Sequence, residues 1–467
     1  MLPKKDEVVD VVVIGGGPGG YTAADRVTQL DGRVILVEKD RLGGNCLNRG
    51  CIPAVSLLRS AQIFSLAKMA KQFGVIVGEV SVNYEALTKR KDELVGNLVA
   101  GTERRLMSSG VEVIKGRGTL AGPRLVEILK DDGQFETVRT KNIIIATGSR
   151  SIESAMPGSS SKEIIMAEEA LALKKLPRSM AIIGCDYIGV QLACIFNRLG
   201  TDVTIVEEEP RLLPAEDEEI ATLLQELLTA YGIEIMTEAK ATTIASETSG
   251  EKRLTLTTKG GMRDIRVEEA VLSRGRRPNT EGVGLEKAGV VMNDSGGVIV
   301  DKHMRTNIPN IYAVGDAVGR FMLAQIAMAE GNVAAENAMG RDSEIDYKVV
   351  PRCLFTLPEV ATVGLTERQA IEQGHKIKVA RLPLELNGFA HIIGQTEGLI
   401  KIITDAQFGE ILGMHIIGPQ ASDLIHEAAL GMRLEATVED MARTIRVHPS
   451  LAEAIRDAAW RLYSPVL

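Results

Sequence analysis

The chain has 467 residues, 45% of them hydrophobic, and a formal net charge of −8. This length allows three or four domains with apolar cores, and the acidic balance argues against nucleic acid as a partner. The first residues lack the apolar core of a signal peptide, and no apolar run reaches the ~20 residues of a membrane span. We therefore expect a cytoplasmic protein without a membrane segment.

Residues 8–14 form an apolar, β-branched run that leads into a glycine-rich turn, which predicts a buried strand followed by a helix. Gly15, Gly17 and Gly20 have the GxGxxG spacing, which lets a pyrophosphate approach the backbone at a helix N-terminus. A second predicted strand ends at Glu38, where a carboxylate can bind the hydroxyl groups of a ribose. Together these elements predict a dinucleotide-binding unit.

Two cysteines, Cys46 and Cys51, follow this unit with four residues between them. A disulfide that closes so small a loop removes little chain entropy, and strain and exposure make such a bond easy to reduce. The alternative is a pair of unbonded core cysteines. The glycines around the pair and the nucleotide turn before it favour a redox-active pair. The other cysteines have no partner at such a spacing, and we expect ordinary thiols at Cys185, Cys194 and Cys353.

The following segments extend this first domain. Helical spacing of apolar residues predicts helices at 56–70 and 84–107. Residues 142–146 form a further buried strand, which a Thr147-Gly148 turn closes.

A second strand–turn–helix pattern begins at residues 180–183 and carries Gly184 and Gly189 in its turn. The next predicted strand ends at Glu207, a carboxylate that suits the 2′-hydroxyl of NAD and would repel the 2′-phosphate of NADP. Two such units in one chain imply two bound nucleotides.

After the second unit, residues 311–314 predict a strand whose turn contains Asp316. Alternating patterns at 355–363, 399–404 and 411–417 then predict an antiparallel sheet accompanied by helices.

His448 stands near the C-terminus, directly before Pro449, which suits the first turn of a helix. Glu453 then lies a little over one turn along that helix. A carboxylate fixes the tautomer of an imidazole and raises its basicity, as a general base requires. A histidine that only caps the helix is the alternative.

In this order, the cysteine pair, the two nucleotide turns and the His–Glu pair resemble the FAD-dependent pyridine nucleotide–disulfide oxidoreductases, most closely dihydrolipoamide dehydrogenase. The resemblance covers almost the whole chain. It implies an α/β fold with two Rossmann-like dinucleotide-binding domains, for FAD and NAD, and an α+β C-terminal dimerisation domain. The implied order is a first FAD segment, the NAD domain, a central FAD segment and the dimerisation domain, at residues 1–149, 150–275, 276–345 and 346–467.

The resemblance also implies residue roles. Cys46 would exchange with a substrate thiol, and Cys51 would face the flavin. His448, with Glu453, would act as a base in the site of the partner subunit, so that a homodimer is needed. The implied FAD residues are Gly15, Gly17, Gly20, Glu38, Gly44, Thr147, Gly148, Asp316 and Ala317. The implied NAD residues are Gly184, Tyr187, Gly189, Glu207 and Gly275. The substrate would be a lipoyl group on a carrier protein, or a small dithiol.

Several positions depart from the family. At the flavin, Ser, Lys and Glu are replaced by Ala54, Val55 and Gln191, so both ends of an expected ion pair are missing. A further position has Gln325 where His is usual. Mercuric reductases share this family arrangement but need a pair of cysteines near the C-terminus. The last five residues here, Tyr-Ser-Pro-Val-Leu, contain no cysteine. Glutathione-type reductases use NADPH, against which Glu207 counts.

At the nicotinamide site, Asp186 replaces the middle glycine and Arg274 replaces an apolar residue. We expect these two side chains to pair, directly or through water, and to occupy the space of the pyrophosphate. Two hypotheses follow. The protein is a working dihydrolipoyl-type dehydrogenase, or it is a flavoprotein with an impaired nicotinamide site that uses another oxidant or serves as a binding subunit.

Overall fold

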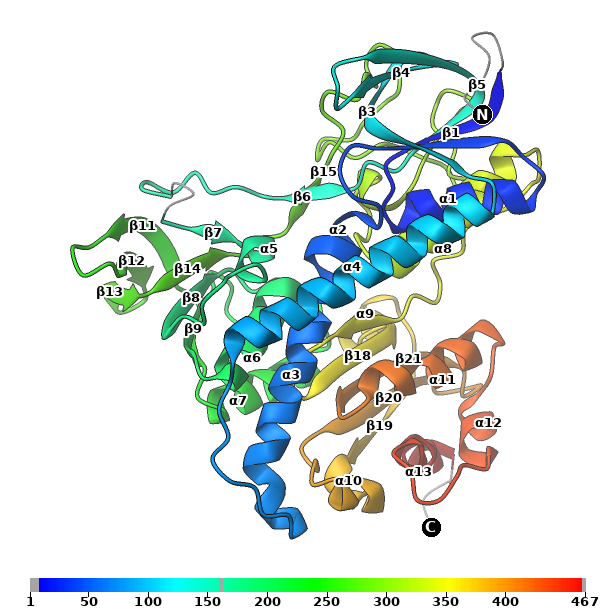
Figure 1. Ribbon diagram of the computed structural model, residues 1–467. Helices are drawn as coiled ribbons and strands as arrows, with labels where there is room; N and C mark the ends of the chain where they lie inside the picture. Colours follow the sequence, from blue (N-terminus) through cyan, green and yellow to red (C-terminus); the bar gives the residue numbers. More distant parts are fainter. Residues whose placement is uncertain (1–7, 160–162, 464–467) are drawn as a thin grey trace.

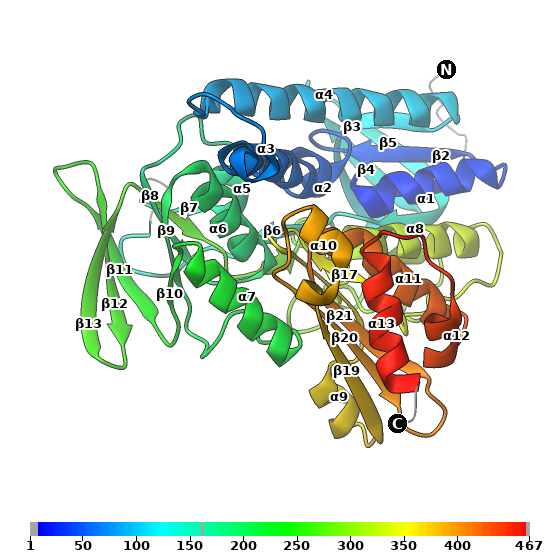
Figure 2. The ribbon, with the colours of Figure 1, turned by 90° about the horizontal axis from the view of Figure 1, so that it is seen from below.

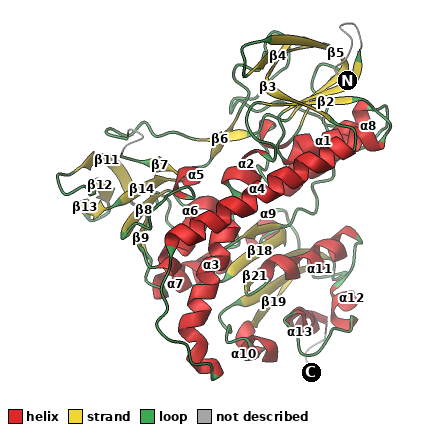
Figure 3. Ribbon diagram, in the orientation of Figure 1, coloured by secondary structure: helices red, strands yellow, loops and turns green. Residues whose placement is uncertain are grey.

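The computed structural model of the protein describes residues 8–159 and 163–463. Two sheets built on parallel strands, the first with one antiparallel strand, and one antiparallel sheet near the C-terminus organise the molecule (Figure 1). Figure 3 shows the strands of the first two sheets at separate corners, with the long helix α4 (Tyr84–Ser108) running from one toward the other and α3 (Cys51–Met69) extending away from both. The expected fold class is confirmed.

The first sheet is built around β1, which is buried along almost its whole length and pairs in parallel with β2 and β5. β16 also pairs with β5, so the chain returns to this sheet after completing the second unit. Helices α1 (Pro18–Gln29) and α8 (Ala324–Ala338) pack against each other. The strands are β1 (Val9–Ile14), β2 (Val34–Glu38), β3 (Glu112–Gly122), β4 (Leu125–Lys130), β5 (Phe135–Ile145) and β16 (Ile311–Ala313).

The second parallel sheet has the strand order β10-β9-β8-β14-β7, and helices α6 (Tyr187–Leu199) and α7 (Glu218–Ala230) belong to the same unit. Its strands are β7 (Ile165–Met166), β8 (Ser179–Ile183), β9 (Asp202–Val206), β10 (Glu234–Met236) and β14 (Glu269–Leu272). The unit is completed by α5 (Ala167–Ala170), β11 (Lys240–Ser246), β12 (Lys252–Thr258) and β13 (Gly261–Val267). A two-stranded ribbon, β6 (Ser149–Ser151) with β15 (Arg276–Pro278), connects it to the first unit.

The C-terminal sheet is antiparallel, in the order β17-β18-β21-β20-β19. Figure 2 shows α11, α12 and α13 on one side of this sheet and α7 on the other. The strands are β17 (Arg352–Leu354), β18 (Glu359–Gly364), β19 (Ile377–Pro383), β20 (Leu399–Asp405) and β21 (Ile411–Gly418). The helices are α9 (Glu367–Glu372), η3 (Leu384–Leu386), α10 (Gly388–Ile392), α11 (Ala421–Arg433), α12 (Val438–Arg443) and α13 (Ala452–Tyr463).

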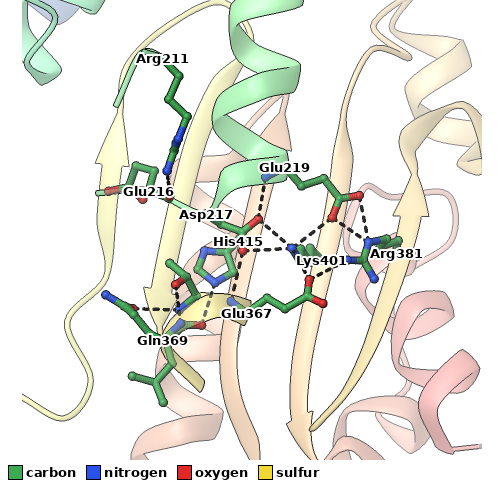
Figure 4. Close-up of polar contacts among 11 residues, drawn as sticks. Arg211, Glu216, Asp217, Glu219, Glu367, Gln369, Arg381, Lys401 and His415 are labelled. Atoms are coloured by element: carbon green, nitrogen blue, oxygen red, sulfur yellow. Dashed lines mark hydrogen bonds and ion pairs between the residues drawn. The ribbon is translucent and has the colours of Figure 1, made fainter. Parts of the chain in front are cut away.

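A row of polar residues crosses this sheet in register, one on each strand: Arg352, Thr362, His415, Lys401 and Arg381. The row faces the acidic segment that begins α7 (Figure 4). Lys401 is only 2% exposed, and its Nζ lies 2.8 Å from Asp217 Oδ1 and 3.1 Å from Glu219 Oε2. Asp217 also caps α7. These contacts hold the second nucleotide unit against the C-terminal sheet.

Within the described ranges, one helical stretch, Gly44–Phe73, is long and apolar enough to cross a membrane, judged by length and composition alone. It comprises α2 (Gly44–Arg49), α3 and η1 (Ala70–Phe73). Leu57, Leu58 and Ala61 on α3 are buried and pack into the core that contains α6. The apolar character of this stretch thus serves packing within the fold.

Candidate active site

The cysteine pair lies at the junction of two helices: Cys46 belongs to α2, and Cys51 begins α3. Gly44 brings this segment against the first nucleotide turn, because a Cβ on Gly44 would lie 2.7 Å from Gly17 Cα. Its φ of 57° also favours glycine. The redox segment and the nucleotide turn therefore approach each other through glycine backbone.

Both cysteines are free thiols here, and each side chain shifts the pKa of the other. The hydrogen bond from the Cys46 thiol holds the pKa of Cys51 below its ordinary value. The same bond, together with burial, raises the pKa of Cys46. The arrangement favours a thiolate at Cys51 and a protonated thiol at Cys46.

A cavity of about 490 Å³ is lined by Cys46 and by the first nucleotide turn. The sequence-predicted residues that line it are Gly15, Gly17, Glu38, Gly44, Cys46, Thr147, Gly148 and Asp316. Gly20 instead supports the turn from behind, since a Cβ there would lie 1.8 Å from Gly15 O. Ala317 is fully buried in η2 (Gly315–Ala317), beside Asp316. Cys51 is exposed but is not among the lining residues.

The cavity fits FAD. Thr147 Oγ1 is buried there without a hydrogen-bond partner among the described residues, and so offers a polar group to a ligand. Helix α1 begins at Pro18, and its N-cap residue, Gly17, has no side chain. The N–H groups of the first turn therefore have no side-chain acceptor at this cap. Glu38 Oε2 accepts a hydrogen bond from Gly16 N–H at 2.6 Å, which fixes the carboxylate beside the turn.

The second unit repeats this local geometry. Gly184 N–H donates to Val206 O at 2.9 Å, and Cys185 N–H donates to Glu207 Oε2 at 2.8 Å. Gly189 packs near Ser273, and a Cβ there would lie 2.9 Å from Gly184 O. The glycine frame and the acidic residue expected for NAD are therefore in place.

The expected direct contact of Asp186 with Arg274 is wrong. Arg274 forms an ion pair with Glu208, while Asp186 caps α6. Asp186 Oδ2 accepts a hydrogen bond from Gly275 N–H at 2.9 Å. Backbone N–H groups satisfy this carboxylate, so it does not need a guanidinium. The backbone donors at this turn, the N–H groups of Ile188, Gly189 and Gly275, are therefore already bound by Asp186.

Tyr187 begins α6, and its hydroxyl donates to the buried Glu216, whose carboxylate also accepts from Thr362 Oγ1 at 3.1 Å. Burial raises the pKa of Tyr187. The residue expected at the nicotinamide site is therefore tied to the row of polar residues on the C-terminal sheet.

The missing ion pair beside the flavin leaves a polar group without a partner. Val55 on α3 is half-buried, and α3 packs against α6, which carries Gln191. Gln191 Nε2 is buried and has no hydrogen-bond partner among the described residues. Ala54 is buried in the core, and Gln325 Nε2 donates to Pro351 O at 3.0 Å.

His448 and Glu453 lie together, with Nδ1 of the imidazole 3.0 Å from Glu453 Oε1. The hydrogen bond from His448 lowers the pKa of Glu453. α13 begins only at Ala452, so Pro449 lies before the helix and not in its first turn. The His448 side chain is 83% exposed and does not line the cavity beside Cys46.

Two residues near the flavin cavity were given no role from the sequence. Arg276 lines the cavity and donates from Nη2 to Ser149 O at 2.9 Å. Glu330 on α8 is 1% exposed and accepts from Gly315 N–H at 2.6 Å, directly before Asp316. Arg276 follows Gly275, which the resemblance did assign to a site, so its position in the sequence offered a signal. Glu330 lies within an alanine-rich helix, where no sequence motif marks it as a site residue.

The chain matches the model of the pyridine nucleotide-disulphide oxidoreductases over residues 9–331 and that of their dimerisation domain over residues 350–459. A curated relative named dihydrolipoyl dehydrogenase, from Chlamydia muridarum, is 39% identical over 458 residues, which cover 97% of each chain. Another of that name, from Bacillus subtilis, is 37% identical over 462 residues, which cover 96% of this chain and 97% of the relative.

Two solved structures resemble the protein along nearly its whole length. LpdA from Mycobacterium tuberculosis has a TM-score of 0.89 at 29% identity, covering 97% of this chain and 99% of that one. The Cu(II) complex of the HOCl-induced flavoprotein disulfide reductase RclA from Escherichia coli has a TM-score of 0.87 at 27% identity, with the same coverage.

Proposed function

Because the chain belongs to the pyridine nucleotide–disulphide oxidoreductases, whose dihydrolipoyl dehydrogenases use FAD and NAD, we propose that Cys46 and Cys51 oxidise a dihydrolipoyl-type dithiol. The match to the dimerisation domain supports a homodimer. The substrate is a lipoyl group carried on a protein, or a small dithiol of the same chemistry.

In the oxidised enzyme, a substrate thiolate attacks the sulfur of Cys46 and breaks the bond to Cys51, which leaves as a thiolate. The second substrate thiol then attacks the mixed disulfide and releases the substrate as a disulfide. Two electrons and two protons thus pass from the substrate to the enzyme. Bound FAD supplies the acceptor for this electron pair.

Cys51 suits the role of leaving thiolate because the hydrogen bond from Cys46 lowers its pKa, and a thiol of low pKa is the better leaving group. His448 of the partner subunit takes the substrate proton, and Glu453 holds its imidazole so that Nε2 is the free acceptor. The exposure of His448 supports this role across a subunit interface.

The placement of Cys46 in the lining of the first nucleotide cavity, with Cys51 at the start of the next helix, is the observation that carries this function. The test is anaerobic stopped-flow reduction of the purified flavoprotein by dihydrolipoamide, followed at the flavin absorbance maximum. We expect reduction of one flavin per subunit by the dithiol and much slower reduction by a monothiol. Equal rates with the two reductants, or no reduction by the dithiol, would exclude the proposal.

A further inference from the structure

The two nucleotide turns differ at one equivalent position, the residue that caps the nucleotide-binding helix. In the first unit this residue is Gly17, and α1 has no side-chain cap. In the second it is Asp186, whose side chain accepts from the N–H groups of Ile188 and Gly189 at 3.1 and 2.9 Å. The same chain therefore contains one open and one self-capped helix N-terminus.

The remaining donors around the second turn bind the same carboxylate. Gly275 N–H donates to Oδ2 at 2.9 Å, and the hydroxyl of Ser273 donates to Oδ1. The Asp186 carboxylate thus accepts hydrogen bonds from three backbone N–H groups and one hydroxyl, which belong to α6 and to the segment after β14. Such donors at a helix N-terminus are those that bind the phosphates of a dinucleotide.

Arg274 also lies beside the second nucleotide turn. It follows β14, and its ion pair with Glu208, which follows β9, crosses the end of β8, the strand between them. Its side chain also covers the first glycine of the turn, because a Cβ on Gly184 would lie 2.9 Å from Arg274 Cγ. A dinucleotide laid over the turn would have to displace both side chains.

We propose that Asp186 is a built-in competitor of the dinucleotide pyrophosphate and sets a low affinity of this protein for NAD(H). The carboxylate occupies the donors that the pyrophosphate needs, and its charge repels the phosphates. The inference concerns the nicotinamide half of the proposed function and is tested without dithiol turnover.

The test is calorimetric titration of the FAD-loaded protein with ADP-ribose, which carries the pyrophosphate and cannot reduce the flavin. Asp186→Gly should bind at least about tenfold more tightly than the natural protein, and Asp186→Asn should also bind more tightly, because it removes the charge. Asn can still cap α6, so this variant remains informative if Asp186→Gly is unstable. A thermal melt of each variant checks that it is folded.

The matched control is Glu209→Gln, which removes an exposed acidic side chain from the same unit outside this set of donors. Its dissociation constant for ADP-ribose should stay within about twofold of the natural value. If neither Asp186 variant binds more tightly than this control, or if the natural protein binds ADP-ribose with a micromolar dissociation constant, the inference is overturned. Loss of dithiol reduction alone would contradict the proposed function and leave this result standing.

The reverse exchange, Gly17→Asp, should weaken FAD binding in the first unit. The protein has room for it, because the nearest atom to a Cβ on Gly17 is Gly44 Cα at 3.8 Å. We expect the purified variant to carry well under half of the FAD of the natural protein, measured as the ratio of flavin to protein absorbance. Full FAD content in a folded Gly17→Asp protein would show that a carboxylate at this position does not compete, and would contradict the inference.

Discussion

Arg274 and Glu208 form an ion pair that joins the loops after β14 and β9 across the end of β8. The pair leaves Asp186 to the backbone donors of α6 and covers the first glycine of the second nucleotide turn. Two side chains of the protein, Asp186 and Arg274, therefore lie at the second nucleotide turn, one on its backbone donors and one beside its first glycine.

Replacing Arg274 with Val, the kind of residue usual in the family, should leave more space beside that glycine. We expect ADP-ribose to bind a few-fold more tightly, and more tightly still when Asp186→Gly is added. Stability should change by only about 0–1 kcal/mol, because side chains 37% and 38% exposed gain little from pairing. Calorimetric titration measures the first effect and urea unfolding the second. Weaker binding in Arg274→Val would mean that the guanidinium grips a phosphate.

Cys46→Ser should keep FAD and lose dithiol turnover. The serine is close in size to the cysteine but cannot form the mixed disulfide, so steady-state oxidation of dihydrolipoamide should fall by at least about a thousandfold. Flavin content and turnover are measured on the same preparation. Cys353→Ser is the control, since Cys353 lies on β17 of the C-terminal sheet, and it should keep its turnover. Turnover retained in Cys46→Ser would remove this cysteine from the exchange step.

The absent ion pair should weaken the charge-transfer band of the Cys51 thiolate with the flavin. A lysine ammonium ~4 Å away contributes roughly 4 kcal/mol at an effective dielectric of ~20, before desolvation and its Glu partner cancel most of it. The double variant Val55→Lys/Gln191→Glu should therefore show a stronger long-wavelength band after dithiol reduction near neutral pH than the natural protein does.

Val55→Lys alone should be less stable than the double variant, because it places a charge without its partner beside α6. Gln191→Glu alone is the second control and should show no gain in the band. A strong band already present in the natural protein would contradict the prediction.

His415 should make the stability of the C-terminal sheet depend on pH. Its full burial lowers its pKa below the ordinary value of 6.5, while the unfolded chain titrates near that value. The unfolded chain then binds the extra proton, so the free energy of unfolding should fall as the pH falls below about 6.5, by up to about 1.4 kcal/mol per pH unit.

The groups that face His415 are Thr362 and Lys401 on the neighbouring strands, and Glu216 and Asp217 before α7. The pKa of Asp217 is lowered, so its contribution is lost only below its ordinary value of 3.8, outside the window from pH 7 to 5. His415→Gln keeps a donor for Leu365 O and should lose less stability over this window in urea unfolding. Equal pH dependence in the two proteins would contradict the prediction.

The sequence by itself determined the elements whose signals are local. The apolar runs of β1 and β8, the glycine spacing of the two turns and the acidic residues Glu38 and Glu207 are fixed by backbone sterics and hydrogen bonding over a few residues. The six-residue span of Cys46 and Cys51 is local in the same way.

Only the tertiary structure decided which partners the charged side chains take. Arg274 pairs with Glu208, while backbone donors of α6 satisfy Asp186, the partner expected from the sequence. The buried Lys401 binds Asp217, which lies 184 residues earlier in the sequence. No local pattern encodes such pairs, because they depend on how separate units pack and on which groups that packing removes from water.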